Sequence, residues 1–111
     1  MKIKTNELTG AALDWAVAQI ESEAGADKAE KQWRYFGRVF KPSADWAQGG
    51  PIIERELIDV VRVGISNRCA SRTMEDGSIV GAYGPTPLIA AMRCYVASKL
   101  GDEVDVPEEL A

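Results

Sequence analysis

The apolar positions near the start of the chain follow the spacing of an amphipathic α-helix. They recur at intervals of three and four and so share one helical face: Leu13, Ala16, Val17 and Ile20. Thr9 precedes this pattern and offers an oxygen cap, and Gly25 follows it as a natural stop. We therefore predict a helix over about residues 10–24, with its apolar face on the core.

A second and clearer helix is predicted near the end of the chain. Thr86 is suited to cap it, Pro87 to take its first position and Gly101 to end it. The apolar residues of this segment form a broad face: Leu88, Ile89, Met92, Tyr95, Val96 and Leu100. The breadth of this face predicts a buried or half-buried central helix over about residues 87–100.

Strand patterns lie elsewhere. Residues 2–5 alternate Lys-Ile-Lys-Thr, and residues 59–65 are rich in β-branched side chains. Two further runs, 68–73 and 78–83, flank a turn that contains Asp76-Gly77, a strong turn dipeptide, so we predict a β-hairpin there.

Two further segments precede that hairpin. Residues 33–40 favour a strand, with a helix over 27–35 as the competing interpretation. The segment 45–51 reads as a loop, after which Pro51 would begin a short helix through about Ile58.

After the last helix, the chain from residue 102 onward is polar. We expect this tail to pack only through Val104, Val106 and Leu110. Together these elements predict an α+β fold in one small domain, with a short antiparallel sheet packed against the N-terminal and C-terminal helices.

The composition of the chain limits the classes of protein to which it can belong. A chain of 111 residues with 46% hydrophobic content supports one core, and it lacks both an apolar run long enough for a membrane span and an apolar region behind its N-terminus. We therefore expect a cytosolic protein whose two cysteines, Cys69 and Cys94, are free thiols. The thirteen basic residues against seventeen acidic ones argue against binding to duplex nucleic acid.

Histidine is absent, which removes the usual general base near neutral pH and the commonest metal ligand. Schemes that pair serine or cysteine with histidine are excluded, as are zinc sites of the Cys₂His₂ kind. We expect no enzymatic activity, no cofactor and no metal.

The segment after Asp45 is the first half of a candidate site. Trp46 would provide a stacking platform for a planar ring, Gln48 would read the edge of that ring, and Gly49 and Gly50 would allow close approach. The alternative is that the Trp46 indole folds back into the core, as tryptophans commonly do.

The helix start at Thr86 is the second half, because unpaired amides and the helix dipole attract an anion there. A plain cap is the alternative reading. Arg93 shares that helix face at i+7, and Arg68 and Arg72 point to one face of the hairpin. The three arginines either form a phosphate-binding cluster or are solvated, and Asp14 is a candidate partner for one of them.

Three blocks of sequence carry a family resemblance: Thr9–Ala18, Asp45–Ile53 and Gly84–Val104. With these blocks in this order, the chain resembles the NinX family, small proteins of tailed bacteriophages and prophages that form a domain of unknown function. The resemblance implies a phage-encoded accessory protein, absent from the virion, that acts in the cytoplasm of the infected cell. It implies no activity and no site residue.

The leading hypothesis is a binding module in which the Trp46 loop and the Thr86 helix start enclose a small anionic, ring-bearing ligand such as a nucleotide. In a phage, such a binding module would sequester a host defence signal. The alternative is a protein-interaction module that uses Trp46 as an aromatic anchor against a host protein or against its own copy in a homo-oligomer. A regulator of nucleic acid is a third reading, which the acidic balance disfavours.

Overall fold

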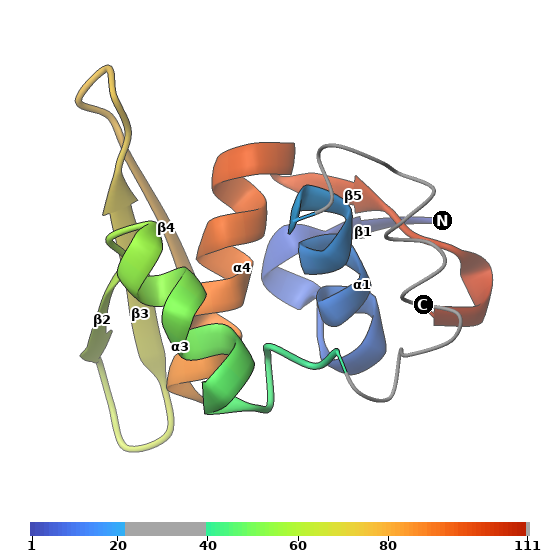
Figure 1. The fold of residues 1–111 in the computed structure, drawn as a ribbon, viewed down its shortest axis with the longest axis horizontal. Helices are drawn as coiled ribbons and strands as arrows, with labels where there is room; N and C mark the ends of the chain where they lie inside the picture. The colour runs from blue at the N-terminus through green and yellow to red at the C-terminus, as the bar shows by residue number, and fades with distance from the viewer. Residues whose placement is uncertain (22–39, 111) are drawn as a thin grey trace.

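One helix, α4 (Pro87–Leu100), occupies the middle of the molecule, with a β-sheet on one side and helix α1 (Gly10–Glu21) on the other (Figure 1). The computed structural model describes residues 1–21 and 40–110. The α+β prediction and the position of both predicted helices are confirmed. The described part of α1 ends at Glu21, so the prediction that it continues to about residue 24 lies outside the described residues.

The local chemistry of α4 is what its sequence predicted. The Ile89 N–H donates to the Thr86 hydroxyl at 3.1 Å, Pro87 lies in the first turn, and Gly101 ends the helix with a φ of 90°. The helix is buried on nearly every side, because the sheet covers one face and α1 the other. Met92 and Val96 are fully enclosed by these two layers.

The sheet beside α4 has the strand order β2-β3-β4, with both pairs antiparallel. It is built from β2 (Asp59–Arg62), β3 (Arg68–Thr73) and β4 (Ile79–Gly84), so the hairpin is confirmed and the extended piece over 59–65 forms a shorter strand. At the turn, Gly77 adopts a φ of 88°, and Asp76 Oδ1 accepts from the Ser78 N–H at 2.9 Å. This tip reaches beyond the rest of the molecule (Figure 1).

The C-terminal tail is not held only by a few apolar side chains, as the sequence suggested. Its strand β5 (Glu103–Asp105) pairs antiparallel with β1 (Lys2–Lys4), so that Ile3 lies opposite Val104. Short 3₁₀ turns follow β1 and β5, η1 (Thr5–Glu7) and η2 (Glu108–Leu110). The alternation of charged and apolar residues over 103–106 is a strand pattern, but its partner lies 100 residues away in the sequence, which no local pattern shows.

The predicted loop around Trp46 is wrong, because this segment is helical. Helix α3 runs Trp46–Arg55, with Asp45 as its N-cap and Pro51 in its interior rather than at its first position. Two glycines and a proline lower the intrinsic helix propensity, which is why the sequence favoured a loop. A proline there removes only one backbone hydrogen bond, and the tertiary contacts of α3 outweigh that loss.

Gly49 supplies the main such contact. A Cβ atom at Gly49 would collide with the Pro42 carbonyl oxygen and with a methyl group of Leu88. The missing side chain therefore lets α3 lie directly on the segment that precedes it and on the first turn of α4.

The strand predicted over 33–40 and the helix predicted over 27–35 fall outside the described residues, apart from Phe40, which belongs to neither kind of element. Within residues 1–21 and 40–110, no helix combines the length and the apolar character that a membrane crossing requires.

The close approach of β4 to α4 gives a first test. A Cβ atom at Gly84 would lie 2.7 Å from the backbone nitrogen of Ala90, so Gly84→Ala forces β4 and α4 apart. We expect it to lower the free energy of unfolding by about 1–3 kcal/mol. Gly64→Ala is the matched control, because a Cβ there meets nothing within 4 Å. Urea unfolding of both variants measures the difference, and equal stabilities would contradict the packing argument.

Candidate functional site

Trp46 is the first residue of α3, and its side chain is 58% exposed. The interpretation that its indole fills the core is therefore wrong. Gly50 lies one turn further along α3, and a Cβ atom there would be 3.8 Å from Cε3 of the indole. The ring thus lies along the helix over Gly50, at a distance of ordinary van der Waals contact.

The polar residues beside Trp46 are occupied by the helix start. Asp45 Oδ1 accepts from the Ala47 N–H at 2.9 Å, and Asp45 Oδ2 accepts from the Gln48 amide at 3.1 Å. The Gln48 carbonyl oxygen accepts in turn from the Lys41 N–H at 2.7 Å. These bonds fix the entry into α3, so Gln48 is committed to the fold on both ends of its amide.

The two segments proposed as halves of one site, the Trp46 segment that was predicted as a loop and the helix start at Thr86, lie next to each other. Gly49 of α3 rests against Leu88 in the first turn of α4, and both helices begin at the same end of the molecule (Figure 1). In that first turn, the Ile89 and Ala90 N–H groups donate to Thr86 and Pro87 has no N–H. Only the Leu88 amide is left without such a bond in this described turn, so the α4 start is a weak anion site.

Arg93 serves the core rather than a ligand. Its side chain is buried, and its Nε and Nη1 donate to the carbonyl oxygens of Leu8 and Tyr83, each at 2.8 Å. Burial lowers the pKa of the Arg93 guanidinium. By binding the chain after η1 and the end of β4, Arg93 fastens both to α4.

The other two predicted arginines have separate partners. Arg72 Nη1 donates to Glu56 Oε1 and to the Ser98 hydroxyl, each at 3.1 Å, whereas Arg68 Nη1 donates to the neighbouring Asn67 carbonyl. The structure therefore does not join Arg68, Arg72 and Arg93 into one cluster. Arg68 lies opposite Gly84 in the sheet, just before the start of α4, whereas the Arg93 guanidinium that reaches the neighbouring Tyr83 is bound to its carbonyl.

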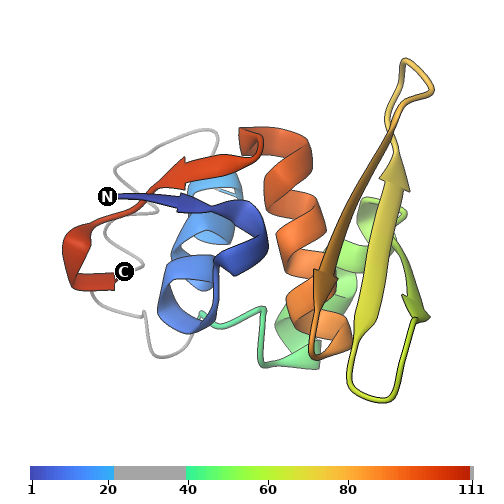
Figure 2. The same ribbon diagram turned by 180° about the vertical axis from the view of Figure 1, so that it is seen from behind.

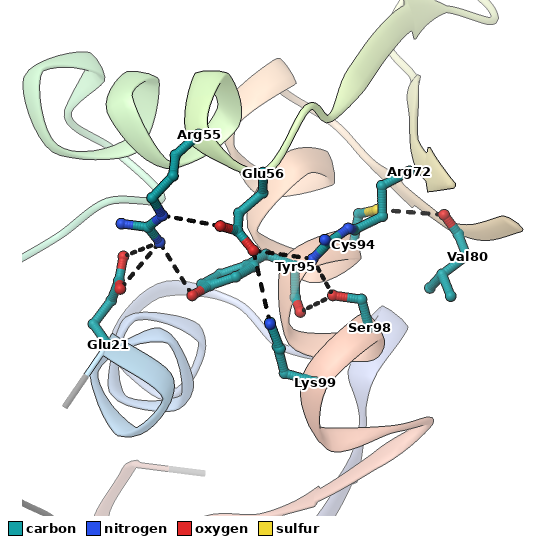
Figure 3. Close-up of polar contacts among 9 residues, drawn as sticks. All are labelled: Glu21, Arg55, Glu56, Arg72, Val80, Cys94, Tyr95, Ser98 and Lys99. Atoms are coloured by element: carbon teal, nitrogen blue, oxygen red, sulfur yellow. Dashed lines mark hydrogen bonds and ion pairs between the residues drawn. The ribbon is translucent and has the colours of Figure 1, made fainter. Parts of the chain in front are cut away.

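A cluster around Glu56 was not foreseen from the sequence (Figure 3). Glu56 caps the C-terminus of α3, and its side chain is only 14% exposed. Arg55 Nε lies 2.9 Å from its Oε2, while Arg72 Nη1 and Lys99 Nζ lie 3.1 and 3.8 Å from its Oε1. Burial raises the pKa of Glu56, but the hydrogen bond and charge of Arg55, with Arg72 and Lys99, outweigh this and lower it overall.

Arg55 extends the cluster to α1. Its Nη2 donates to Glu21 Oε1 at 2.8 Å and to the Tyr95 hydroxyl at 3.2 Å (Figure 3). The hydrogen bonds of Arg55 to Glu21 and then to Glu56 raise the pKa of its guanidinium. Burial, with the nearby Glu21 carboxylate, raises the pKa of Tyr95 to about 12. Every carboxylate of this cluster has a cationic partner. We therefore assign the cluster a structural role, which is to hold α1, α3, β3 and α4 together. Adjacent charges at 55 and 56 were its only trace in the sequence.

Asp14 does not pair with Arg68, Arg72 or Arg93, which were its candidate partners in the sequence. It is buried in α1, and its Oδ1 accepts from the Ser43 N–H at 2.9 Å. Burial raises the pKa of Asp14, and the hydrogen bonds to Ser43 oppose that rise. The contact anchors the chain that leads into α3.

The thiols offer no obvious nucleophile. Cys69 and Cys94 are both free, as predicted, and burial raises the pKa of Cys94 to about 11, which keeps it protonated near neutral pH. Among residues 1–21 and 40–110, no group of three or more metal-ligating side chains could hold an ion.

The molecule is thus a small α+β protein built around one enclosed helix, with an exposed indole at one end. A family model described as Bacteriophage P22, NinX matches residues 4–99. The match spans most of the chain, so the protein belongs to the NinX family, as the sequence resemblance indicated. This is a phage protein family whose function is unknown. A search of curated proteins found no match to this chain.

The Glu56 cluster predicts a pH-dependent stability. Because the pKa of Glu56 is lowered by folding, its contribution is present above the unfolded pKa and is lost as the pH falls through the folded one. Glu56→Gln should cost about 2 kcal/mol at pH 7, by weakening bonds to charged donors. The difference in the free energy of unfolding between Glu56→Gln and the parent protein should shrink below about pH 4.

Glu54→Gln is the control, because Glu54 is exposed on the same helix. Thermal and urea unfolding at pH 7 and pH 3 would measure both variants. A Glu56→Gln deficit that stays constant between the two pH values would contradict the ionic origin of the cluster.

Proposed function

We propose that the protein is a non-enzymatic binding module in which a small anionic, ring-bearing ligand, such as a nucleotide, stacks on the Trp46 indole. The observation that supports this most directly is the 58% exposure of an indole that lies along α3 over Gly50. Such a ring presents a flat apolar surface to solvent, on which a planar ligand can stack. Stacking of a base on an aromatic side chain contributes about 1–3 kcal/mol.

The surroundings of Trp46 favour an anion modestly. The positive ends of the α3 and α4 dipoles meet at this end of the molecule. Two cationic residues are nearby in the backbone, because the Lys41 N–H bonds to Gln48 of α3 and Arg68 lies opposite Gly84. The Asp45 carboxylate opposes them from within the α3 cap. Stacking therefore supplies most of the proposed affinity, and charge selects among ring-bearing ligands.

A binding role needs little chemistry from the protein. The chain has no histidine, the Cys94 thiol is protonated near neutral pH, and the buried Asp14 carboxylate bonds to a backbone amide. In a phage protein acting in the cytoplasm of an infected cell, retention of a nucleotide-like host defence signal would be a useful outcome.

The stacking proposal is tested by replacing the indole. In calorimetric titrations against a panel of mononucleotides and cyclic dinucleotides, the parent protein should bind at least one compound, and Trp46→Ala should weaken that binding at least tenfold. Trp15→Phe is the matched control, because Trp15 lies on α1, outside the site. The proposal fails if no compound in the panel binds the parent protein, or if Trp46→Ala binds as the parent does.

A second candidate is a protein-interaction module anchored by Trp46. The observation that favours it is the engagement of Asp45 and Gln48 in the cap of α3, because the Gln48 amide is then held by the fold and not turned to the edge of a stacked ring. An exposed tryptophan on a rigid helix is typical of an interface anchor, whether against a host protein or a second copy of this chain.

Trp46→Ala separates the two candidates. If Trp46 anchors a self-association, light scattering after size-exclusion chromatography should show a parent oligomer that the variant reduces to monomer mass. If it anchors a host protein, the variant should lose one defined co-purifying protein. A monomeric parent that retains no host protein would contradict this candidate and leave the nucleotide titration as the deciding measurement.

A further inference from the structure

Among the strands that the structure describes, β4 is an edge strand, and it has no charged residue. The order β2-β3-β4 leaves β2 and β4 at the two edges, and β2 carries Asp59 and Arg62. The strands β1 and β5 also carry charges at both of their ends. Proteins commonly protect strand edges with charges, because an unprotected edge pairs with other chains. The sequence of β4, Ile-Val-Gly-Ala-Tyr-Gly, has no such protection.

The free backbone groups of β4 follow from its pairing. The Met74 N–H donates to the Ser78 carbonyl at 2.7 Å, which identifies that pair as a hydrogen-bonded one. Because bonded pairs alternate in an antiparallel ladder, Val80 and Ala82 bond to β3, while Ile79 and Gly81 direct their N–H and C=O groups away from the sheet. Tyr83 also faces outward, but its carbonyl already accepts from Arg93.

These outward groups border a hollow of about 400 Å³. One wall is the edge of β4, and the opposite wall is the chain from β1 into η1 together with the start of β5. The lining includes Lys4, Ile79, Gly81, Ala97, Asp102 and Glu103. Figure 2 shows β4 and β1 on either side of α4, whose Ala97 lines the hollow between them. Its volume falls within the range of about 300–1,000 Å³ that ligand pockets occupy.

The charges around the hollow are unbalanced. It is lined by one ammonium group, that of Lys4, and by two carboxylates, those of Asp102 and Glu103. Lys4 lies opposite Glu103 in the β1–β5 ladder, so these two offset each other, and the Asp102 carboxylate is left over. Among the described residues, none of the three side chains takes part in an ion pair. The hollow is therefore complementary to a single positive charge.

We propose that the hollow receives an extended peptide segment of a partner protein, which adds as a strand to the edge of β4 and places an arginine or lysine near Asp102. Pairing with Ile79 and Gly81 would supply the main-chain hydrogen bonds. The Asp102 carboxylate would select a peptide that carries a basic side chain. The part of β4 that lines the hollow, Ile79–Gly81, would face about three residues of an added strand, because a strand rises about 3.4 Å per residue.

A single strand fits this place better than a second copy of the chain. Continuing the sheet with β4 of another copy would require that whole sheet to enter beside β4, where β1, η1 and the start of β5 form the opposite wall. A short extended segment has no such body. The site shares no residue with the Trp46 end and does not depend on the nucleotide proposal.

The probe is an acetylated, amidated peptide of five residues with a central arginine flanked by valine and threonine. Its binding would be followed through the backbone amide signals of ¹⁵N-labelled protein. We expect saturable shifts at Ile79 and Gly81, and at least tenfold weaker binding for the peptide with glutamate at its centre. A peptide N-methylated along its pairing edge should not bind, because it lacks the donors for the ladder.

Gly81→Pro removes an outward N–H without removing a β3–β4 bond, so it should reduce binding at least tenfold. Arg62→Pro is its matched control, because the Val63 N–H bonds to Asn67 and the Arg62 N–H therefore faces outward at the opposite edge. Asp102→Asn should retain the fold and lose the preference for arginine over glutamate, which keeps the test decisive if Gly81→Pro does not fold.

Three results would overturn the proposal. They are no binding of the arginine peptide to the parent protein, equal binding of the N-methylated peptide, and unchanged binding by folded Gly81→Pro. Protection of the Ile79 and Gly81 amides that grows with protein concentration, without peptide, would assign this edge to a second copy instead.

Discussion

The rest of the structure depends on the enclosure of α4. A helix covered on both sides must accept close neighbours, and small residues at its contact with the sheet make that possible. Ala70 and Ala82 on the sheet and Ala90 on the helix are buried, and Gly84 lies so close to Ala90 that no side chain fits between them. Interiors packed this densely have little tolerance for added volume, so the positions of β4, α1 and α3 follow from α4.

Polar groups drawn into this packing are matched to partners. Arg93 binds two backbone carbonyls, Asp14 binds a backbone amide, and Glu56 is surrounded by three cations. A buried charge without partners would be costly, so these contacts fix how the segments around α4 are placed. Because these side chains are engaged within the fold, they are not available to contact a ligand. Two features on the outside of the described structure stay available to a partner: the exposed indole of Trp46 and the edge of β4, which carries no charged residue.

Much of the fold could be predicted because its signals are local. Thr86, Pro87 and Gly101 define the ends of α4, and Asp76-Gly77 defines the hairpin turn, through backbone preferences that act within a few residues. The prediction failed for α3, where Gly49 reads as a loop residue but serves a contact with Leu88. It also failed for β5, whose partner strand is at the other end of the chain. Of the candidate site, the sequence pointed to Trp46 and the Thr86 helix start as neighbouring segments, but it did not show that Trp46 begins a helix or which partners bind Arg72 and Arg93.

The sequence by itself determined the elements: two helices with their caps, a hairpin with its turn, and a chain without histidine that belongs to a phage protein family. These properties depend on residue identity and on neighbours a few positions away. Only the tertiary structure decided which charged side chains are buried and paired, that Trp46 starts a helix and faces solvent, and that the edge of β4 borders a hollow. Those outcomes depend on contacts between segments far apart in the chain, and burial, which sets the strength of each electrostatic contact, exists only once the segments have packed.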